Sequence, residues 1–316
     1  MIPFITDEQV QGIVSPQIAV EVVRDAFMEH AANRASNLFR VRAGDKSTSL
    51  STMGGVIPKL GVVGVKSYTT INGKFNFVVN LFDAFSGELL CVVAANALTA
   101  IRTAAVTLLA FEAASVNHLN TFALFGTGVQ AWSHLQLLST RWKIDTLHVV
   151  GYTAAQTKDF CDRARDQLDI RLIVQSNTSQ ALNQSRAIVT ATRAKYPLFD
   201  GAEVVAGSFV AAIGSSKPDT RELDEALMLR AEHIIVEWKP QSIAEAGEFA
   251  QLDALTTQSL PIHELGSLLT NPINRSGSGD NICIYKSVGV GISDIAICGF
   301  VFKELYSAGT LKNIDR

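Results

Sequence analysis

A glycine-rich turn between an apolar run and an amphipathic run is the first feature of this sequence that could carry chemistry. Residues 122–135 read FALFGTGVQAWSHL, and Gly126 to Ala131 fit the pattern Gly-x-Gly-x-x-Ala. In a strand–turn–helix unit, the first glycine permits the tight turn and the second lets the backbone approach a pyrophosphate at the helix N-terminus. A glycine turn without a cofactor has the same letters, so the flanking elements decide between the two interpretations.

Three basic residues are candidates for binding an anionic substrate. Lys66 lies in the apolar run GVVGVKSY, where an unpaired buried charge would be costly, so a partner or a substrate is favoured over a surface position. Arg40 alternates with Arg42 along a predicted strand, and a solvated position is the simpler interpretation of it. Arg102 lies in a predicted helix among apolar residues. A salt bridge on the helix surface and a role in a binding site are equally good interpretations of it.

Two sequence patterns divide the chain into elements that must position these residues. A helix is predicted over 17–34, short strands over 37–93 with a hairpin turn from Asp83 to Gly87, and a long helix over 96–114. From about residue 120, short apolar runs alternate with helical segments: TFALF, TLHVV, RLIV, AIVTAT, SFVAAIG and HIIVEW. This alternation predicts βαβ units and a parallel sheet, in which the glycine turn follows the first strand. In that setting a nicotinamide dinucleotide is the favoured ligand.

The composition excludes several other classes of function. The 316 residues are 47% apolar and carry a formal net charge of -3, which gives no basic face for nucleic acid or an anionic membrane. No apolar run reaches the roughly 18 to 20 residues of a membrane span, and the N-terminus lacks a signal-like basic region, so we expect a cytoplasmic protein. The cysteines lie far apart and the histidines form no ligand pattern, so neither a disulfide scaffold nor a metal site is expected.

The segment after the second predicted strand bears on cofactor choice. An acidic residue about 20 positions after the glycine turn usually binds the adenosine ribose. Here TLHVV is followed by Gly151, Tyr152 and Thr153, with no acid and no arginine. Without a carboxylate there is no repulsion against a 2'-phosphate, so the sequence permits NADH and leans toward NADPH.

Five motifs in order carry a resemblance to a known family: GVVGVKSY at 61–68, ALTAIRTAAVTLLA at 97–110, FGTGVQA at 125–131, AIGSSKPDTREL at 212–223 and YKSVGVGISDIA at 285–296. Their order and spacing resemble the ornithine cyclodeaminase/mu-crystallin family over nearly the whole chain. The resemblance implies an α/β fold with a Rossmann-type doubly wound domain over 118–289. It also implies a discontinuous α+β substrate-binding and dimerisation domain, made of 1–117 and a C-terminal helix over 290–316, through which two chains form a homodimer.

The resemblance also assigns roles to individual residues. The family's carboxylate-binding arginine lies 13 residues before a methionine and falls on Arg40 ahead of Met53; its active-site lysine falls on Lys66. By the same resemblance, the residues near the substrate are Arg40, Lys66, Arg102, Ser216 and Val288. Those near the cofactor are Arg102, Gly126, Gly128, Val129, Gln130, Tyr152, Thr153, Thr192, Ile213, Gly214, Ser215 and Ser287.

One departure from the family pattern separates the activities that the resemblance implies. Where the cyclodeaminases have an aspartate that handles the amine of ornithine, this chain has Ser216, which cannot act as a base near neutral pH. The sequence therefore favours NAD(P)H-dependent reduction of a cyclic ketimine carboxylate, such as Δ1-pyrroline-2-carboxylate or Δ1-piperideine-2-carboxylate. The alternatives are an ornithine cyclodeaminase, an alanine- or opine-type dehydrogenase, and a crystallin-like protein that binds the cofactor without turnover.

Overall fold

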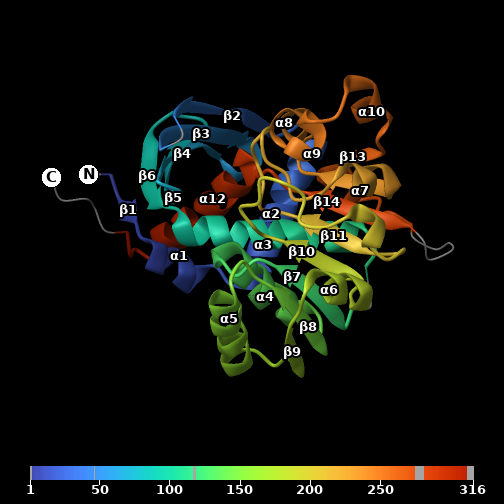
Figure 1. The fold of residues 1–316 in the computed structure, drawn as a ribbon. Coiled ribbons are helices and arrows are strands. Elements are labelled where there is room, and N and C mark those ends of the chain that lie inside the picture. The colour runs from blue at the N-terminus through green and yellow to red at the C-terminus, as the bar shows by residue number, and fades with distance from the viewer. Residues whose placement is uncertain (1, 46, 117–118, 275–280, 312–316) are drawn as a thin grey trace. The chain divides into compact units, whose positions relative to one another are not determined.

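The computed structural model describes residues 2–45, 47–116, 119–274 and 281–311, and the chain forms two compact units (Figure 1). The first unit comprises Met1–Val106 and Gly289–Arg316, and the second comprises Thr107–Val288. The first junction falls inside one continuous helix, α3 (Asn96–Ala113). The boundary expected at 117/118 lies outside the described residues. The C-terminal helix expected over 290–316 is shorter than predicted: it spans Gly291–Ser307, residues 308–311 are not helical, and 312–316 lie outside the described residues.

The first unit is built on a six-stranded sheet in the order β1-β6-β5-β4-β3-β2. Its strands are β1 (Phe4–Ile5), β2 (Ser36–Gly44), β3 (Thr48–Ile57), β4 (Val62–Ile71), β5 (Lys74–Asp83) and β6 (Leu89–Ala94), and a 3-10 turn, η1 (Pro58–Leu60), precedes β4. Neighbours from β2 to β6 pair antiparallel, because each hairpin has a short turn. The predicted turn after Asp83 is confirmed: the Asp83 carboxylate accepts hydrogen bonds from the amides of Phe85 and Ser86, and Gly87 has a φ of +75°.

Helix α12 (Gly291–Ser307) forms the centre of this unit, and the sheet curves around it (Figure 1). It is almost entirely buried along its first two turns, which explains why its sequence is apolar all round. Glycines permit its close approach to β3: a Cβ on Gly291 would lie 2.0 Å from the carbonyl oxygen of Gly54. The remaining helices of the unit are α1 (Asp7–Ile13) and α2 (Pro16–Ala31), the latter beginning one residue before the predicted helix and ending three before its predicted end.

The second unit contains an eight-stranded sheet in the order β13-β12-β14-β11-β10-β7-β8-β9, in which every pairing is parallel. Its strands are β7 (Thr121–Phe125), β8 (Thr146–Val150), β9 (Leu172–Gln175), β10 (Ala187–Thr190), β11 (Phe209–Ala212), β12 (Ala231–Val236), β13 (Ile262–Glu264) and β14 (Ile282–Lys286). This confirms the predicted Rossmann-type doubly wound domain. The order reverses at β7, which lies between β8 and β10, and ligands of such sheets bind at this switch point.

Helices connect these parallel strands. They are α4 (Val129–Arg141), α5 (Ala154–Gln167), α6 (Thr178–Gln184), α7 (Glu225–Arg230), α8 (Lys239–Glu245), α9 (Gly247–Ala250), α10 (Ala254–Ser259) and α11 (Leu265–Leu268), with a 3-10 turn, η2 (Gly201–Glu203). Within the described ranges, no helix is long and apolar enough to cross a membrane. The central strands β10, β11 and β14 are buried along their whole length, as a sheet covered on both faces requires.

Candidate active site

The first unit holds a buried ionic cluster around Lys66. Strand β4 carries Lys66, whose side chain is 1% exposed, and its Nζ donates hydrogen bonds to Oδ1 of Asp294 at 2.8 Å and to Oγ1 of Thr99 at 2.5 Å. Nζ also lies 4.4 Å from the centre of the Phe77 ring. The expectation that this lysine has a partner is met, and the partner is a carboxylate on α12.

Asp294 joins two of the predicted substrate residues. Its Oδ1 accepts from Lys66 and also from Nε of Arg102, at 3.1 Å, while the Asp294 side chain is fully buried. The other oxygen, Oδ2, has no hydrogen-bond partner among the described residues. Helix α3 therefore presents Arg102 inward, and the interpretation of Arg102 as a salt bridge on a helix surface is wrong because its side chain is buried.

The pKa values of this cluster follow from burial and neighbouring charge. Burial lowers the pKa of Lys66 to about 8; the Asp294 carboxylate opposes this effect, whereas Arg102 and Arg40 add to it. Burial alone would raise the pKa of Asp294, but the charges of Arg102 and Lys66, together with the hydrogen bond from Lys66, hold it below its ordinary value. Asp294 is thus an anion and Lys66 is mostly protonated at neutral pH.

Arg40 reaches the same cluster from β2. Its Nη2 donates to the carbonyl oxygen of Gly289 at 2.8 Å and lies 3.3 Å from Sδ of Met53. Arg40 and Met53, 13 positions apart in the sequence, are thus in contact across the paired strands β2 and β3. Arg40 is half-buried, so the interpretation of Arg40 as a solvated side chain is also wrong.

The second unit holds the glycine turn at the end of β7. Gly126 has a φ of +111°, and a Cβ there would lie 2.5 Å from the carbonyl oxygen of Ala191, so only glycine fits. Gly128 is the N-cap of α4 and is exposed; a Cβ there would meet open space, and no side chain caps the helix. Val129 is 72% exposed, whereas the side-chain oxygen of Gln130 is buried without a partner among the described residues.

The residues expected at the two ends of the cofactor follow other strands at this edge of the sheet. Tyr152, after β8, is 97% exposed, and Thr153 caps α5 by accepting a hydrogen bond from the amide of Gln156. Thr192 follows β10, residues 213–215 follow β11, and Ser287 follows β14. Because the carboxyl ends of parallel strands meet at one edge, the structure brings these residues to the edge that also carries Gly126.

Glu222 connects the loops after β10 and β11. Its buried carboxylate accepts hydrogen bonds from the amide and the hydroxyl of Thr192 and from the amide of Gly214, each at 2.7 Å, and from the hydroxyl of Thr190 at 2.8 Å. A Cβ on Gly214 would lie 2.0 Å from the carbonyl oxygen of Thr192, which shows how closely the two loops pack. Ile213 itself is buried.

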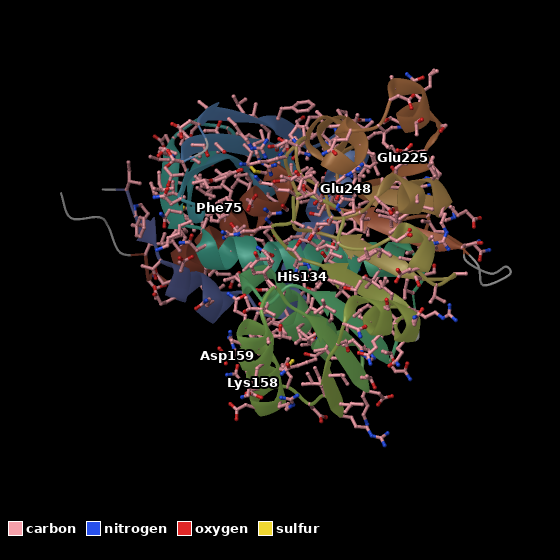
Figure 2. The ribbon with its side chains drawn as sticks, viewed as in Figure 1. Phe75, His134, Lys158, Asp159, Glu225 and Glu248 are labelled. Carbon is pink, nitrogen blue, oxygen red and sulfur yellow. The ribbon has the colours of Figure 1, made fainter. Side chains whose placement is uncertain are left out.

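A second pair of buried charges, Lys286 and Glu248, supports the loop that follows β11. Lys286 is paired with Glu248 at 3.2 Å, and its Nζ donates to the carbonyl oxygen of Ser215 at 2.8 Å (Glu248 is labelled in Figure 2). These bonds fix the backbone immediately before Ser216. The amide of Glu222 in turn donates to Glu248 at 2.8 Å, so this pair and the Glu222 network are continuous.

Glu237 orients the chain after β14. The Ser287 hydroxyl donates to it at 2.6 Å and the Val288 amide donates to it at 3.0 Å. The hydroxyl hydrogen of Ser287 is therefore committed to Glu237. The described residues contain no group of three or more His, Cys, Asp or Glu side chains placed to hold a metal ion.

Sequence reasoning missed the acidic members of both sites. Asp294 stands in the apolar stretch GISDIAICGF, and the argument applied to Lys66, that a charge among apolar residues needs a partner, would have found it. No comparable signal marks Glu222, which follows a charged and polar loop. The four hydrogen bonds from Thr190, Thr192 and Gly214 to its carboxylate are known only from the fold.

Comparisons with known proteins agree with the motifs. The model of the ornithine cyclodeaminase/mu-crystallin family matches residues 9–309. The Δ1-pyrroline-2-carboxylate reductase of Colwellia psychrerythraea is 30% identical over 260 residues, 77% of this chain and 80% of that protein. Ketimine reductase mu-crystallin of Mus musculus is 29% identical over 231 residues, 73% of this chain and 70% of that protein.

Solved structures are similar over the full length. A probable ornithine cyclodeaminase from Bordetella pertussis Tohama I is 36% identical, with a TM-score of 0.93 over 99% of this chain and 100% of that one. The Δ1-pyrroline-2-carboxylate reductase of Thermococcus litoralis, solved with NADH and L-proline, shares the fold at 19% identity, with a TM-score of 0.91 and the same coverage. On the family match across residues 9–309, this chain belongs to the ornithine cyclodeaminase/mu-crystallin family.

Proposed function

We propose that this protein is an NAD(P)H-dependent oxidoreductase that reduces a cyclic ketimine carboxylate, Δ1-pyrroline-2-carboxylate or Δ1-piperideine-2-carboxylate, to the cyclic L-amino acid. The observation that carries the proposal is the cluster in which Lys66 and Arg102 bind the buried carboxylate of Asp294 and the charge of the nearby Arg40 acts on both Lys66 and Asp294. Three cations against one anion leave an excess of positive charge that a substrate carboxylate would balance. The curated relatives of Colwellia and mouse are named as reductases of this kind, which supports the same class here.

The arginines bind and orient the substrate in this proposal. A planar guanidinium presents paired N–H donors that match a carboxylate, so Arg40 and Arg102 are the groups suited to hold it. Both are positioned by backbone: Arg40 donates to the Gly289 carbonyl, and Arg102 packs against Gly289. A carboxylate held in this way fixes the position of the adjacent C=N carbon.

Lys66 supplies the proton. Reduction of the C=N bond forms a C–H bond at carbon and an N–H bond at nitrogen, so one proton must be delivered to the imine nitrogen. With a pKa near 8, the Lys66 ammonium is mostly protonated at neutral pH and acidic enough to be a general acid. It then recovers a proton from solvent. The nicotinamide cofactor, when bound, supplies the hydride.

The turn after β7 fits a dinucleotide. Gly128 leaves open space in front of the uncapped N-terminal amides of α4, which is the arrangement that receives a pyrophosphate. Residues Gly126 to Gln130 would hold it there. Residues 151–153 and the first turn of α5 contain no acid, which supports the preference for NADPH over NADH.

Ser216 argues against deamination of ornithine. A hydroxyl neither pairs with the substrate's side-chain ammonium nor accepts a proton near neutral pH, so the reductase is favoured over the cyclodeaminase. The 36% identical structure from Bordetella is described as a probable ornithine cyclodeaminase, so this activity is the second candidate and is tested beside the first.

The sheet of the first unit supports a homodimer. Its strands β2 to β5 expose seven large apolar side chains: Leu38, Phe39, Val41, Leu50, Val56, Ile71 and Phe75. Phe75 stacks on Phe77 with ring centres 5.6 Å apart, and Figure 2 labels it. The strand register places Leu38 and Val41 on the same face of the sheet as Leu50 and Val56. Exposed apolar surface of this kind is typical of an interface, and the family resemblance implies a second copy of this chain. Light scattering of wild type and Val41→Asp tests it, with a monomer expected for the variant.

The cysteines support the cytoplasm as the compartment. Cys91, Cys161, Cys283 and Cys298 are all free and buried. Such thiols persist in a reducing environment, whereas secreted proteins commonly pair theirs.

The deciding experiment follows NAD(P)H oxidation by near-ultraviolet absorbance with each imine acid, and proline formation from ornithine with NAD⁺. Rapid oxidation with no proline from ornithine is the expected result. Proline from ornithine would overturn the assignment in favour of the cyclodeaminase, and Ser216→Asp is the variant expected to gain that activity. Cofactor binding without turnover of either imine acid would indicate a binding protein instead.

A further inference from the structure

We propose that Asp294 is a positioning residue that keeps Lys66 protonated and oriented as the proton donor of the reaction. This inference rests on the proposed function and goes beyond it, because Asp294 is given no role there except as a counter-charge. The contact joins β4 to α12 across 228 positions of sequence. It is a buried contact between an ammonium group and a carboxylate.

The geometry makes Asp294 the member of the cluster that favours the ammonium form. The groups that face Lys66 are Arg40 from β2, Arg102 and Thr99 from α3, the Phe77 ring from β5, and Asp294 and Cys298 from α12. Both arginines disfavour a third positive charge. Burial raises the pKa of the Cys298 thiol well above its ordinary value, so that group is neutral. Asp294 is the one anion in this set.

The same carboxylate fixes where the proton is held. Oδ1 of Asp294 accepts from Nζ of Lys66 at 2.8 Å and from Nε of Arg102 at 3.1 Å, so it holds the lysine and the arginine in one fixed arrangement. Thr99 holds Nζ from a second direction, and its own hydroxyl donates to the carbonyl oxygen of Ala95. Two acceptors therefore orient the ammonium, but only Asp294 contributes charge.

The role of Asp294 differs from that of Thr99 in a measurable way. Loss of the carboxylate removes both an attractive charge and a hydrogen bond, and the pKa of Lys66 is expected to fall by roughly 1 to 3. Loss of the Thr99 hydroxyl removes a neutral contact, and the pKa of Lys66 is expected to change little. In Asp294→Asn, Lys66 would therefore lose its proton near neutral pH.

The test titrates Lys66 directly. Protein with ¹³C-labelled lysine is followed by NMR across pH, and the Lys66 signal is the one missing from Lys66→Arg. Wild type, Asp294→Asn and the control Thr99→Val are compared, and kcat/KM for imine reduction is measured over the same range. In Asp294→Asn, the titration and the pH above which activity falls are both expected to move down.

An unchanged titration of Lys66 in Asp294→Asn overturns the proposal, and so does an equal fall in Thr99→Val. If the single variant does not fold, Asp294→Asn combined with Arg102→Gln removes one charge of each sign. The pKa of Lys66 is still expected to fall there, because the attraction and hydrogen bond of Asp294 together exceed the repulsion by Arg102. The NMR titration needs no turnover, so it decides whether Asp294 keeps Lys66 protonated even where wild type reduces no imine acid. The kcat/KM profile then decides whether this matters for the reaction, so failure of the proposed function is distinguished from failure of this inference.

Discussion

A Cβ added to Gly289 would lie 2.9 Å from Nη1 of Arg102 and 3.0 Å from its Nη2, so the guanidinium packs directly on the glycine backbone. Gly289 also has a φ of +75° and gives its carbonyl oxygen to Arg40. One residue without a side chain thus positions both arginines of the cluster.

Gly289→Ala is therefore expected to weaken substrate binding. Displacement of the arginines should lower kcat/KM for the imine acid by roughly 10- to 100-fold. Strain at the positive φ should reduce the free energy of unfolding by about 1 to 3 kcal/mol. The control is Gly12→Ala in α1, where a Cβ meets nothing within 4 Å; kinetics as in wild type for both variants would contradict the prediction.

Gly128→Ala separates cofactor binding from folding. A Cβ there meets open space in the protein, so the melting temperature should stay at the wild-type value. The methyl group would occupy the place where a pyrophosphate approaches, and NAD(P)H should bind about tenfold more weakly or worse, as measured by its fluorescence. Gly126→Ala should instead lower both stability and affinity, because its Cβ overlaps the Ala191 carbonyl. Equal cofactor affinities for Gly128→Ala and wild type would refute the assignment of this turn as the pyrophosphate-binding site.

Glu222→Gln is expected to loosen the loops after β10 and β11. The amide group of glutamine can no longer accept at one of the two oxygen positions, so buried donors of Thr190, Thr192 or Gly214 lose their acceptor. The free energy of unfolding in urea should fall by roughly 2 to 4 kcal/mol. Glu225→Gln is the matched control, since this exposed residue lies in the first turn of α7 (Figure 2). If both variants unfold at the same urea concentration, the Glu222 carboxylate does not stabilise these loops as predicted.

The pH dependence of the reaction follows from Lys66. In the proposed reaction its ammonium form donates the proton. This form is lost as pH rises through its pKa of about 8, so kcat/KM should be level below that pH and decline above it. Lys66→Ala should lower turnover by roughly 10²- to 10⁴-fold while cofactor binding is retained. A pH profile in which activity increases from pH 7 to 9 would exclude Lys66 as the acid.

Arg40→Ala tests carboxylate binding separately from proton transfer. The variant is expected to raise KM for the imine acid on the order of tenfold, because a charge-assisted hydrogen bond to the substrate is lost. The cofactor Kd should not change. The pH above which activity declines should move up slightly, because Arg40 lowers the pKa of Lys66. Arg171→Ala, at an exposed position before β9, serves as the control; Michaelis constants that match in the two variants would count against Arg40 as a substrate ligand.

The elements were accessible from sequence because their signals are local. Periodicity over a few residues predicted helix α3 and the alternating strands of the second unit, and Asp83 to Gly87 predicted a hairpin. The glycines of the turn after β7 could be interpreted once the flanking strand and helix were predicted. Ordered motifs predicted the family and, with it, the grouping of Arg40, Lys66 and Arg102.

Only the tertiary structure decided which charges meet. Strand β14 comes last in sequence but is inserted between β11 and β12, and this insertion places Lys286 against Glu248. Asp294 reaches Lys66 because α12 packs inside the sheet that β4 belongs to. Such pairings depend on the packing of segments far apart in the chain, whereas propensity and periodicity act between near neighbours. The residue types are therefore set by sequence, but the ionisation of Lys66 is set by what the fold places around it.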